Sequence, residues 1–407
     1  MDKHSMSLHA LSTRSRKSIA QQMRDIDVYE AGIKIMSPKA VNLIAKLAGI
    51  SSIAANILKQ EMLSLSGEVA VSKGVITGKE RRADCLIIGN IAQYNRLIEK
   101  LKTQPFGLDK IAVSLQELKT NYFLSSYKIS AGDFTIHTNN RTLVMGIINA
   151  TPDSFSGDGI YAHLHDTSKA VSRILQLVAD GADIVDIGGQ STRPGAKPVS
   201  VKEEIERTIP VIKKAVKRIK KPISIDTFRP EVAKRALDAG ASIVNNIMGV
   251  KNNKAIAKLL KQYKAAVVTM HIKGSPQTMQ KNPRYGSLMT EIIASLCASI
   301  DFLKEHGVAK EQIIIDPGIG FGKTVQHNLE IIQRLRELKS LGRPILIGPS
   351  RKSFIGAILR RNPSQRLLGT AASIACAIHN GADIIRVHDV RDMKQVSKLT
   401  DTLTHYN

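Results

Sequence analysis

Polar side chains stand at or shortly after the carboxyl ends of eight predicted strands in the second part of the chain. The first of these strands, Leu143 to Ile148, is short, apolar and β-branched, and it ends in Asn149 before a run of turn-forming residues. Because the parallel strands of a barrel direct their carboxyl ends to one face, we expect such side chains to share a pocket. The other strand ends carry Asp186, Asp226, Asn245, His271, Asp316, Lys352, and Arg386 with His388.

Part of this set has the chemistry of a site for a flat nitrogen heterocycle. Asp226, Asn245 and Asp316 supply short acceptors and an amide. A carboxylate that faces an amino-amidine edge makes two charge-assisted hydrogen bonds, and a site built in this way rejects ligands that lack those donors. We therefore expect these three residues at the bottom of the pocket.

The other part of the set is positively charged. Arg193, Lys352, Arg386 and His388 would lie near the rim, where the helices after strands seven and eight begin and can bind anions. Asn149 can offer an oxygen to Mg²⁺, a hard cation that often binds through substrate phosphates. The combination predicts a ligand that carries both a heterocycle and a diphosphate.

Single positions in this set also have simpler explanations. Asp226 could cap the helix that follows it, His271 could be a core histidine, and the Gly-rich segment 318–322 could be only a tight turn. Lys323 and Arg351 could simply face solvent, and we leave both out of the site. The prediction therefore rests on the whole set, since such motifs are weak evidence one at a time.

Strands and helices alternate from residue 143 onward. Eight such units in about 260 residues favour a closed (β/α)₈ TIM barrel. An open doubly wound sheet is disfavoured further because no dinucleotide-binding fingerprint follows the first strand. The predicted strands are 143–148, 183–187, 222–226, 242–246, 265–270, 312–316, 344–348 and 383–387. The predicted helices are 166–180, 202–219, 230–239, 253–263, 288–306, 326–340, 364–380 and 391–403.

The residues before the barrel predict a separate, small α/β domain. We place this N-terminal module at residues 1–135 and the barrel domain at 136–407, with the first 25 or so residues disordered or loosely helical. The module shows no defensible catalytic constellation. Its pattern predicts helices at 37–47 and 52–65, strands at 67–78 and 84–89, and a helix at 91–101.

The composition narrows the class of protein. The net charge is +24, but basic residues are spread along the chain, and 4% aromatic residues without Trp argue against a nucleic-acid-binding platform. The three cysteines, Cys85, Cys297 and Cys376, are far apart, as expected in a reducing compartment without a zinc site. No apolar run approaches the ~18 residues of a membrane span, so we expect a soluble, cytoplasmic protein.

Residues from about 141 to 405 resemble the dihydropteroate synthases, folate-pathway enzymes that join 6-hydroxymethyl-7,8-dihydropterin diphosphate to p-aminobenzoate. The matching motifs together cover the whole barrel. They are Asn149-Ala-Thr-Pro-Asp-Ser-Phe-Ser, Asp186-Ile-Gly-Gly-Gln-Ser-Thr-Arg-Pro-Gly, Ser224-Ile-Asp-Thr, Val244-Asn-Asn, Met270-His, Asp316-Pro-Gly-Ile-Gly-Phe-Gly-Lys, Ser350-Arg-Lys-Ser and Arg386-Val-His.

The resemblance implies a role for each matching position. It also implies that Mg²⁺ is the cofactor, that sulfonamides compete with p-aminobenzoate and that the protein is a homodimer. The pterin would be held by Asp226, Asn245, Asp316 and Lys352, with Arg386 stacked on its face. The diphosphate would be held by Asn149 through Mg²⁺, Thr192, Arg386 and His388. The p-aminobenzoate would be surrounded by Arg193, Pro194, Phe321 and Ser353. The residues expected to act in catalysis are Asp226, Lys352, Arg386 and His388.

The chain departs from the family pattern at two places, and two alternative functions remain. The family usually has Asp where this chain has Asn246, so a charge that we expect near the pterin is absent. The family usually reads Ser-Asp-Gly-Gly where this chain has Ser156-Gly157-Asp158-Gly159. A pterin-binding methyltransferase of the methyltetrahydrofolate type shares the barrel but needs no diphosphate site. A non-catalytic pterin- or nucleic-acid-binding protein is the second alternative, motivated by the charge and the extra module.

Overall fold

A computed structural model describes residues 8–11, 16–150, 167–191 and 199–405 of the chain. The chain forms two compact units, one of residues 1–120 and one of residues 121–406. The division falls within helix α6 (Leu108–Tyr122), whereas the sequence pattern alone placed the start of the barrel domain at residue 136. None of the described helices is long and apolar enough to cross a membrane.

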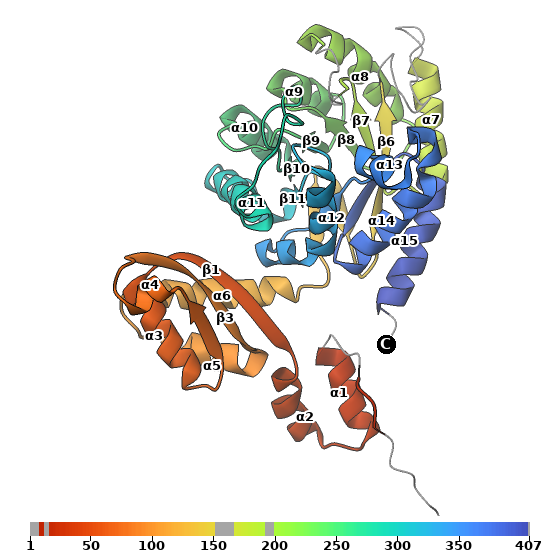
Figure 1. Ribbon diagram of the computed structural model, residues 1–407. Helices are drawn as coiled ribbons and strands as arrows, with labels where there is room; N and C mark the ends of the chain where they lie inside the picture. The colour runs from red at the N-terminus through yellow and green to blue at the C-terminus, as the bar shows by residue number, and fades with distance from the viewer. Residues whose placement is uncertain (1–7, 12–15, 151–166, 192–198, 406–407) are drawn as a thin grey trace, which may run out of the picture. The chain divides into compact units, whose positions relative to one another are not determined.

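The N-terminal unit is built on a three-stranded antiparallel sheet with β3 in the centre (Figure 1). Helix α3 starts directly after β1, where the Ser51 side chain accepts a hydrogen bond from the backbone N–H of Ala54 and so caps the helix. The strands are β1 (Asn42–Ser51), β2 (Glu68–Val71) and β3 (Arg82–Asn90). The helices are α1 (Arg16–Asp25), α2 (Glu30–Met36), η1 (Ser37–Lys39), α3 (Ser52–Leu63), α4 (Lys73–Ile76), α5 (Ile91–Leu101) and the start of α6.

The predicted helix at 37–47 is wrong, because this stretch forms a single 3-10 turn and then strand β1. Leu43 and Ala45 are buried while Ile44 and Lys46 are exposed, so the side chains alternate between two faces as in a strand. Pro38 opens only the 3-10 turn. The predicted helices at 52–65 and 91–101 and the strand at 84–89 are found as α3, α5 and β3.

The second unit is a barrel of eight parallel strands, as predicted from the alternation of strands and helices. The order is β11-β10-β9-β8-β7-β6-β13-β12, and a parallel bridge between Ile315 and Ile345 joins the first and last members. All eight predicted strands are present within one or two residues at most positions. They are β6 (Leu143–Asn149), β7 (Ile184–Gly188), β8 (Ile223–Asp226), β9 (Ile243–Asn246), β10 (Ala266–Met270), β11 (Ile313–Asp316), β12 (Leu346–Ile347) and β13 (Ile384–Val387).

Helices surround the barrel strands in Figure 1. The predicted helix at 326–340 is divided into α12 and the 3-10 helix η3, and the short helix α13 was not anticipated. The α-helices are α7 (Thr167–Ala179), α8 (Val201–Ala215), α9 (Pro230–Asp238), α10 (Lys254–Tyr263), α11 (Leu288–Glu305), α12 (Val325–Gln333), α13 (Ser353–Leu359), α14 (Leu367–His379) and α15 (Val390–His405). The 3-10 helices are η2 (Lys310–Gln312), η3 (Leu335–Leu341) and η4 (Pro363–Gln365).

The barrel interior is filled at its amino-terminal end by an apolar layer. Ile184, Ile243, Ile314 and Ile384 of four different strands belong to this one buried cluster. The hairpin of β4 (Lys128–Ala131) and β5 (Phe134–His137), which the sequence analysis missed, packs its buried residues against the same cluster. Since side chains alternate along a strand, the residue two positions after each member also points inward, toward the carboxyl-terminal end.

Candidate active site

This alternation selects Asp186, Asn245, Asp316 and Arg386 as the next inward layer, and the structure shows three of them in direct contact. Arg386 Nε donates to Asp186 Oδ2 at 2.6 Å, and Asn245 Nδ2 donates to the same oxygen at 3.0 Å. Arg386 Nη2 donates to Asp226 Oδ2 at 2.8 Å. One guanidinium therefore joins the ends of β7 and β8, and one carboxylate orients both an arginine and an amide.

Asp186 is the residue of this cluster to which the sequence analysis gave no role. Its side chain is fully buried, and its Oδ1 has no hydrogen-bond partner among the described residues. Asp186 lies two positions after Ile184 of the apolar layer, so the strand period was the signal that could have placed it on the same inward face as Arg386. Asp186 thus orients the side chains of Arg386 and Asn245, which both donate hydrogen bonds to its Oδ2.

Burial and the neighbouring charges shift the pKa values of the cluster. Burial raises the pKa of Asp226 to about 7, opposed by Arg386 and assisted by the charge of Asp186. Burial also raises the pKa of Asp316 to about 6, although the Gly318 backbone N–H, which donates to its Oδ1 at 2.6 Å, opposes the rise. For Arg386, burial works to lower the pKa, but the Asp186 and Asp226 carboxylates outweigh it and raise the pKa. A ligand that donates hydrogen bonds to the two carboxylates would favour their ionised forms near neutral pH.

Lys352 and Phe321 meet beside this cluster. Lys352 is the residue immediately before α13, and its Nζ lies 4.3 Å from the centroid of the Phe321 ring, a cation–π geometry. Gly320 makes room for the lysine: a Cβ at this position would lie 3.2 Å from Lys352 Cδ. Ser353 is the first residue of α13 and is exposed. Phe321 and Lys352 are therefore brought together from two loops, and Ser353 directly follows Lys352 in the chain.

The predicted anion-binding residues lie at the ends of β6 and β13. Asn149 is the last residue of β6, paired in register with Gly188 of β7. His388 follows β13, and its Nδ1 lies 3.0 Å from Ser350 Oγ, which fixes the ring against the loop after β12. No group of three or more His, Cys, Asp or Glu side chains that could hold a metal ion occurs among the described residues.

Lys323 and Arg351 do not face solvent, so that interpretation of the sequence was wrong. Lys323 is 3% exposed, and its Nζ lies 3.0 Å from Nδ1 of His271, which is 6% exposed. Arg351 Nε donates to Asp389 Oδ2 at 3.0 Å and so connects the loops after β12 and β13. Sequence alone could not show this burial, because each lysine or arginine is paired with a residue distant in the chain.

Asn246 lies on the face of β9 opposite to Asn245, since neighbouring strand residues point to opposite sides. Its Oδ1 accepts a hydrogen bond from the Met248 backbone N–H at 3.0 Å and stabilises the turn after the strand. The expectation that Asn246 removes a charge beside the heterocycle is thus not supported by its position, which is outside the inward-facing cluster.

Some predicted site residues cannot be compared with this geometry. Thr192, Arg193 and Pro194, and the loop Ser156-Gly157-Asp158-Gly159, lie outside the described residues.

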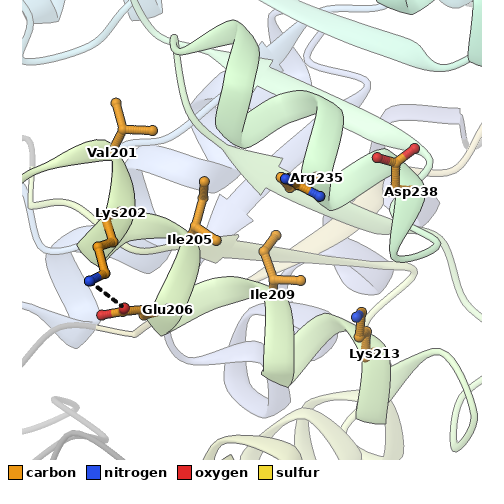
Figure 2. Close-up of a pocket in the computed structure, with 8 residues that line it drawn as sticks. All are labelled: Val201, Lys202, Ile205, Glu206, Ile209, Lys213, Arg235 and Asp238. Atoms are coloured by element: carbon orange, nitrogen blue, oxygen red, sulfur yellow. Dashed lines mark ion pairs between the residues drawn. The ribbon is translucent and has the colours of Figure 1, made fainter.

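A groove of about 700 Å³ lies elsewhere, on the outside of the barrel between α8 and α9. Figure 2 shows the apolar side chains Val201, Ile205 and Ile209 along α8, with Arg235 and Asp238 from α9. None of the clustered strand-end residues lines it. The groove is therefore separate from the strand-end cluster.

The fold and this cluster define a class of protein. Carboxylates, an amide and an arginine that converge at the carboxyl ends of barrel strands are typical of a site for a small polar ligand. Residues 145–388 match the family described as pterin binding enzyme, and the chain belongs to this family.

Named relatives specify the branch of the family. The chain is 51% identical over 264 residues to a dihydropteroate synthase of Synechocystis, covering 65% of this chain and 90% of that protein. A solved dihydropteroate synthase of Xanthomonas albilineans with 4-aminobenzoic acid has 36% identity and a TM-score of 0.63, covering 69% of this chain and 100% of that one. The particular branch is therefore dihydropteroate synthase, a transferase of folate biosynthesis.

A third relative extends beyond the barrel. The chain is 39% identical over 362 residues to a probable bifunctional folylpolyglutamate synthase/dihydropteroate synthase of Halobacterium salinarum, covering 88% of this chain but only 42% of that protein. Because the match is longer than the unit of residues 121–406, it must include part of the N-terminal unit. Part of the N-terminal unit is therefore similar in sequence to at least one relative.

Proposed function

We propose that this chain condenses 6-hydroxymethyl-7,8-dihydropterin diphosphate with p-aminobenzoate to give 7,8-dihydropteroate and diphosphate. The observation that carries the proposal is the Arg386 cluster, in which a guanidinium, Asp226 and Asn245 converge at the ends of three strands. The relatives with the same branch name and the neighbour with bound 4-aminobenzoic acid support the choice of substrates.

The pterin would lie against the carboxylates. Asp226 and Asp316 would accept hydrogen bonds from its amino and ring N–H groups, while Asn245 and Lys352 would bind the remaining donors and acceptors of the ring. Arg386 would stack on the ring face, held in plane by Asp186 and Asp226. The buried carboxylates would then discriminate strongly against rings without matching donors.

The diphosphate would lie on the positively charged side, near Arg386 and His388 and beside Thr192. Mg²⁺ carried by the substrate would fit here, because Asn149, the last residue of β6, has a side-chain oxygen of the kind that a hard cation binds. Bound there, Mg²⁺ would neutralise charge on the leaving diphosphate. Asn149 would be its protein ligand.

The p-aminobenzoate would lie between Phe321 and Ser353, enclosed by Arg193 and Pro194. Phe321 offers an apolar ring face, and Ser353 at the start of α13 offers a hydroxyl to the carboxylate. This arrangement would leave the amino group of the substrate directed toward the pterin.

The reaction would break the C–O bond between the pterin methylene and the diphosphate, with the bonding electrons leaving on the diphosphate. The aniline nitrogen would then form the C–N bond to the methylene carbon and release one proton to solvent. Arg386 and His388 would stabilise the leaving charge, while Asp226 and Lys352 would hold the pterin during the charge build-up. Such a reaction depends more on electrostatic stabilisation and exclusion of water than on a strong base.

The test is direct. The full chain is incubated with Mg²⁺, the pterin diphosphate and p-aminobenzoate, and dihydropteroate and diphosphate are measured by chromatography. Equal amounts of both products are expected. Tight pterin binding without product, or methyl transfer in a parallel incubation with methyltetrahydrofolate, would replace the proposal with one of the alternatives. The homodimer and the cytoplasmic location stay predictions, and light scattering of the purified chain would test the first.

A further inference from the structure

The Gly-rich segment after β11 has three successive carbonyl groups that each accept a hydrogen bond from a side chain. Gln280 Nε2 donates to Gly320 O at 2.6 Å, and Lys323 Nζ donates to Phe321 O at 2.9 Å. Tyr285 OH donates to Gly322 O at 2.8 Å. Gln280, Tyr285 and Lys323, which we call the 320–322 clamp, thus hold this backbone on three consecutive residues.

The segment needs such support because its own sequence does not fix its shape. Gly318, Gly320 and Gly322 all have positive φ, at 72°, 78° and 65°, so the backbone has the freedom of glycine at every second residue. No helix or strand includes these residues. Side-chain donors therefore supply the hydrogen bonds that regular structure supplies elsewhere.

The buried ammonium of Lys323 is well matched to its surroundings. Its Nζ has three acceptor groups around it, namely Phe321 O at 2.9 Å, His271 O at 3.4 Å and His271 Nδ1 at 3.0 Å. An ammonium has three donors and no acceptor, so each N–H can be used. Burial lowers the pKa of His271 to about 3, which keeps the imidazole neutral and able to accept. Burial also lowers the pKa of Lys323 to about 7, so the side chain carries all three N–H donors below that pH. Lys323 therefore ties the end of β10 to the loop after β11.

Tyr285 is also held in place by its ring. The ring lies edge-to-face with His327 at a centroid separation of 5.0 Å, and Lys273 Nζ is 4.2 Å from its centroid. Tyr285 and Gln280 both come from the segment between β10 and α11. This segment is thereby coupled to the loop that carries Phe321.

The segment held by the clamp positions two groups of the proposed site. The Phe321 ring lies under Lys352 Nζ at 4.3 Å, and Phe321 packs with Met270 and Met279 in a buried cluster. Movement of the Phe321 backbone would move the ring and release the ammonium that lies on it.

We propose that Gln280, Tyr285 and Lys323 are positioning residues that hold the Gly320–Gly322 backbone and so fix the Phe321 ring against Lys352 for p-aminobenzoate binding. This inference rests on the proposed function of the same site. None of the three side chains needs to touch a substrate, because each acts through a backbone carbonyl.

The main variant is Tyr285→Phe, which removes one hydroxyl and leaves the ring contacts. Tyr263→Phe is the matched control, since its hydroxyl bonds Asp238 on the outer helices. Loss of one neutral hydrogen bond predicts an increase of about five-fold in KM for p-aminobenzoate. KM for the pterin diphosphate should rise by less than KM for p-aminobenzoate, because Asp226, Asn245 and Asp316 would hold the pterin together with Lys352. Lys323→Met should give a larger increase in the same KM.

Amide hydrogen exchange of the peptide that contains residues 318–324 provides a readout that does not need activity. Exchange should be faster in Tyr285→Phe than in Tyr263→Phe. Equal exchange in the two variants would overturn the clamp, and faster exchange with an unchanged KM for p-aminobenzoate would overturn its link to substrate. If the unmodified chain forms no dihydropteroate, the proposed function fails, whereas the exchange comparison still decides whether the clamp exists.

Discussion

Replacement of Asp186 by Asn is the sharpest test of the Arg386 cluster. The side chain is fully buried and keeps nearly its size, but it loses the charge that Arg386 Nε meets at 2.6 Å and that Asn245 meets at 3.0 Å. A hydrogen bond to a charged group contributes about 1.5–3 kcal/mol. If that energy orients Arg386 in the transition state, kcat/KM for the pterin diphosphate should fall by about ten- to 150-fold.

The same variant should shift the pH profile. The Asp186 charge helps to raise the pKa of Asp226, which burial brings to about 7. If ionised Asp226 accepts hydrogen bonds from the pterin, as proposed, kcat/KM should rise with pH through that value in the unmodified chain. Removal of the Asp186 charge should lower the Asp226 pKa and move this rise to lower pH.

Asp383→Asn is the matched control. Asp383 is buried just before the start of β13, the strand that carries Arg386, and its carboxylate pairs with Lys339 at 3.0 Å. This variant should reduce the free energy of unfolding but leave kcat/KM of the folded enzyme unchanged. Steady-state rates between pH 5 and 9, with circular dichroism to confirm folding, would measure both. An Asp186→Asn variant with kcat/KM within about two-fold of the unmodified chain and an unmoved pH profile would refute the reasoning.

Four further outcomes are expected. Asp226→Ala and Lys352→Ala should each abolish dihydropteroate formation through lost pterin contacts, and normal rates in both would contradict the site. Gly318→Ala should lower the melting temperature more than Gly78→Ala: both glycines have φ of 72°, but a Cβ at Gly318 would lie 2.0 Å from the His271 carbonyl oxygen, whereas nothing lies within 4 Å at Gly78. The folded-state pKa of His271 is about 3, below its ordinary value of 6.5, so the unfolded chain binds more protons between these values and the free energy of unfolding should fall as pH drops through this window. Urea titrations at several pH values should show a smaller acid loss for His271→Gln. Finally, sulfonamides should inhibit in competition with p-aminobenzoate, and inhibition independent of its concentration would count against the proposed site.

The barrel was predictable because its information is local. Each short β-branched run such as Ile313–Asp316 forms a strand buried on both faces, and the polar residue at its end must then lie at the common face of the barrel. The strand β1 was missed because Val41, Ile44, Leu47 and Ala48 recur at the three- and four-residue spacing of a helix, and only pairing with β3 decides for a strand.

What the sequence by itself determined is the order of strands and helices, the set of polar strand ends and the family to which they belong. The tertiary structure alone decided which of those side chains touch: Asp186 and Arg386 are separated by 200 residues, and they meet because β7 and β13 both pair with β6, one on each side. It also decided that Lys323 is buried against His271 and that Arg351 pairs with Asp389. The physical reason is that backbone periodicity is encoded along the chain, whereas burial and charge pairing depend on the neighbours that folding supplies.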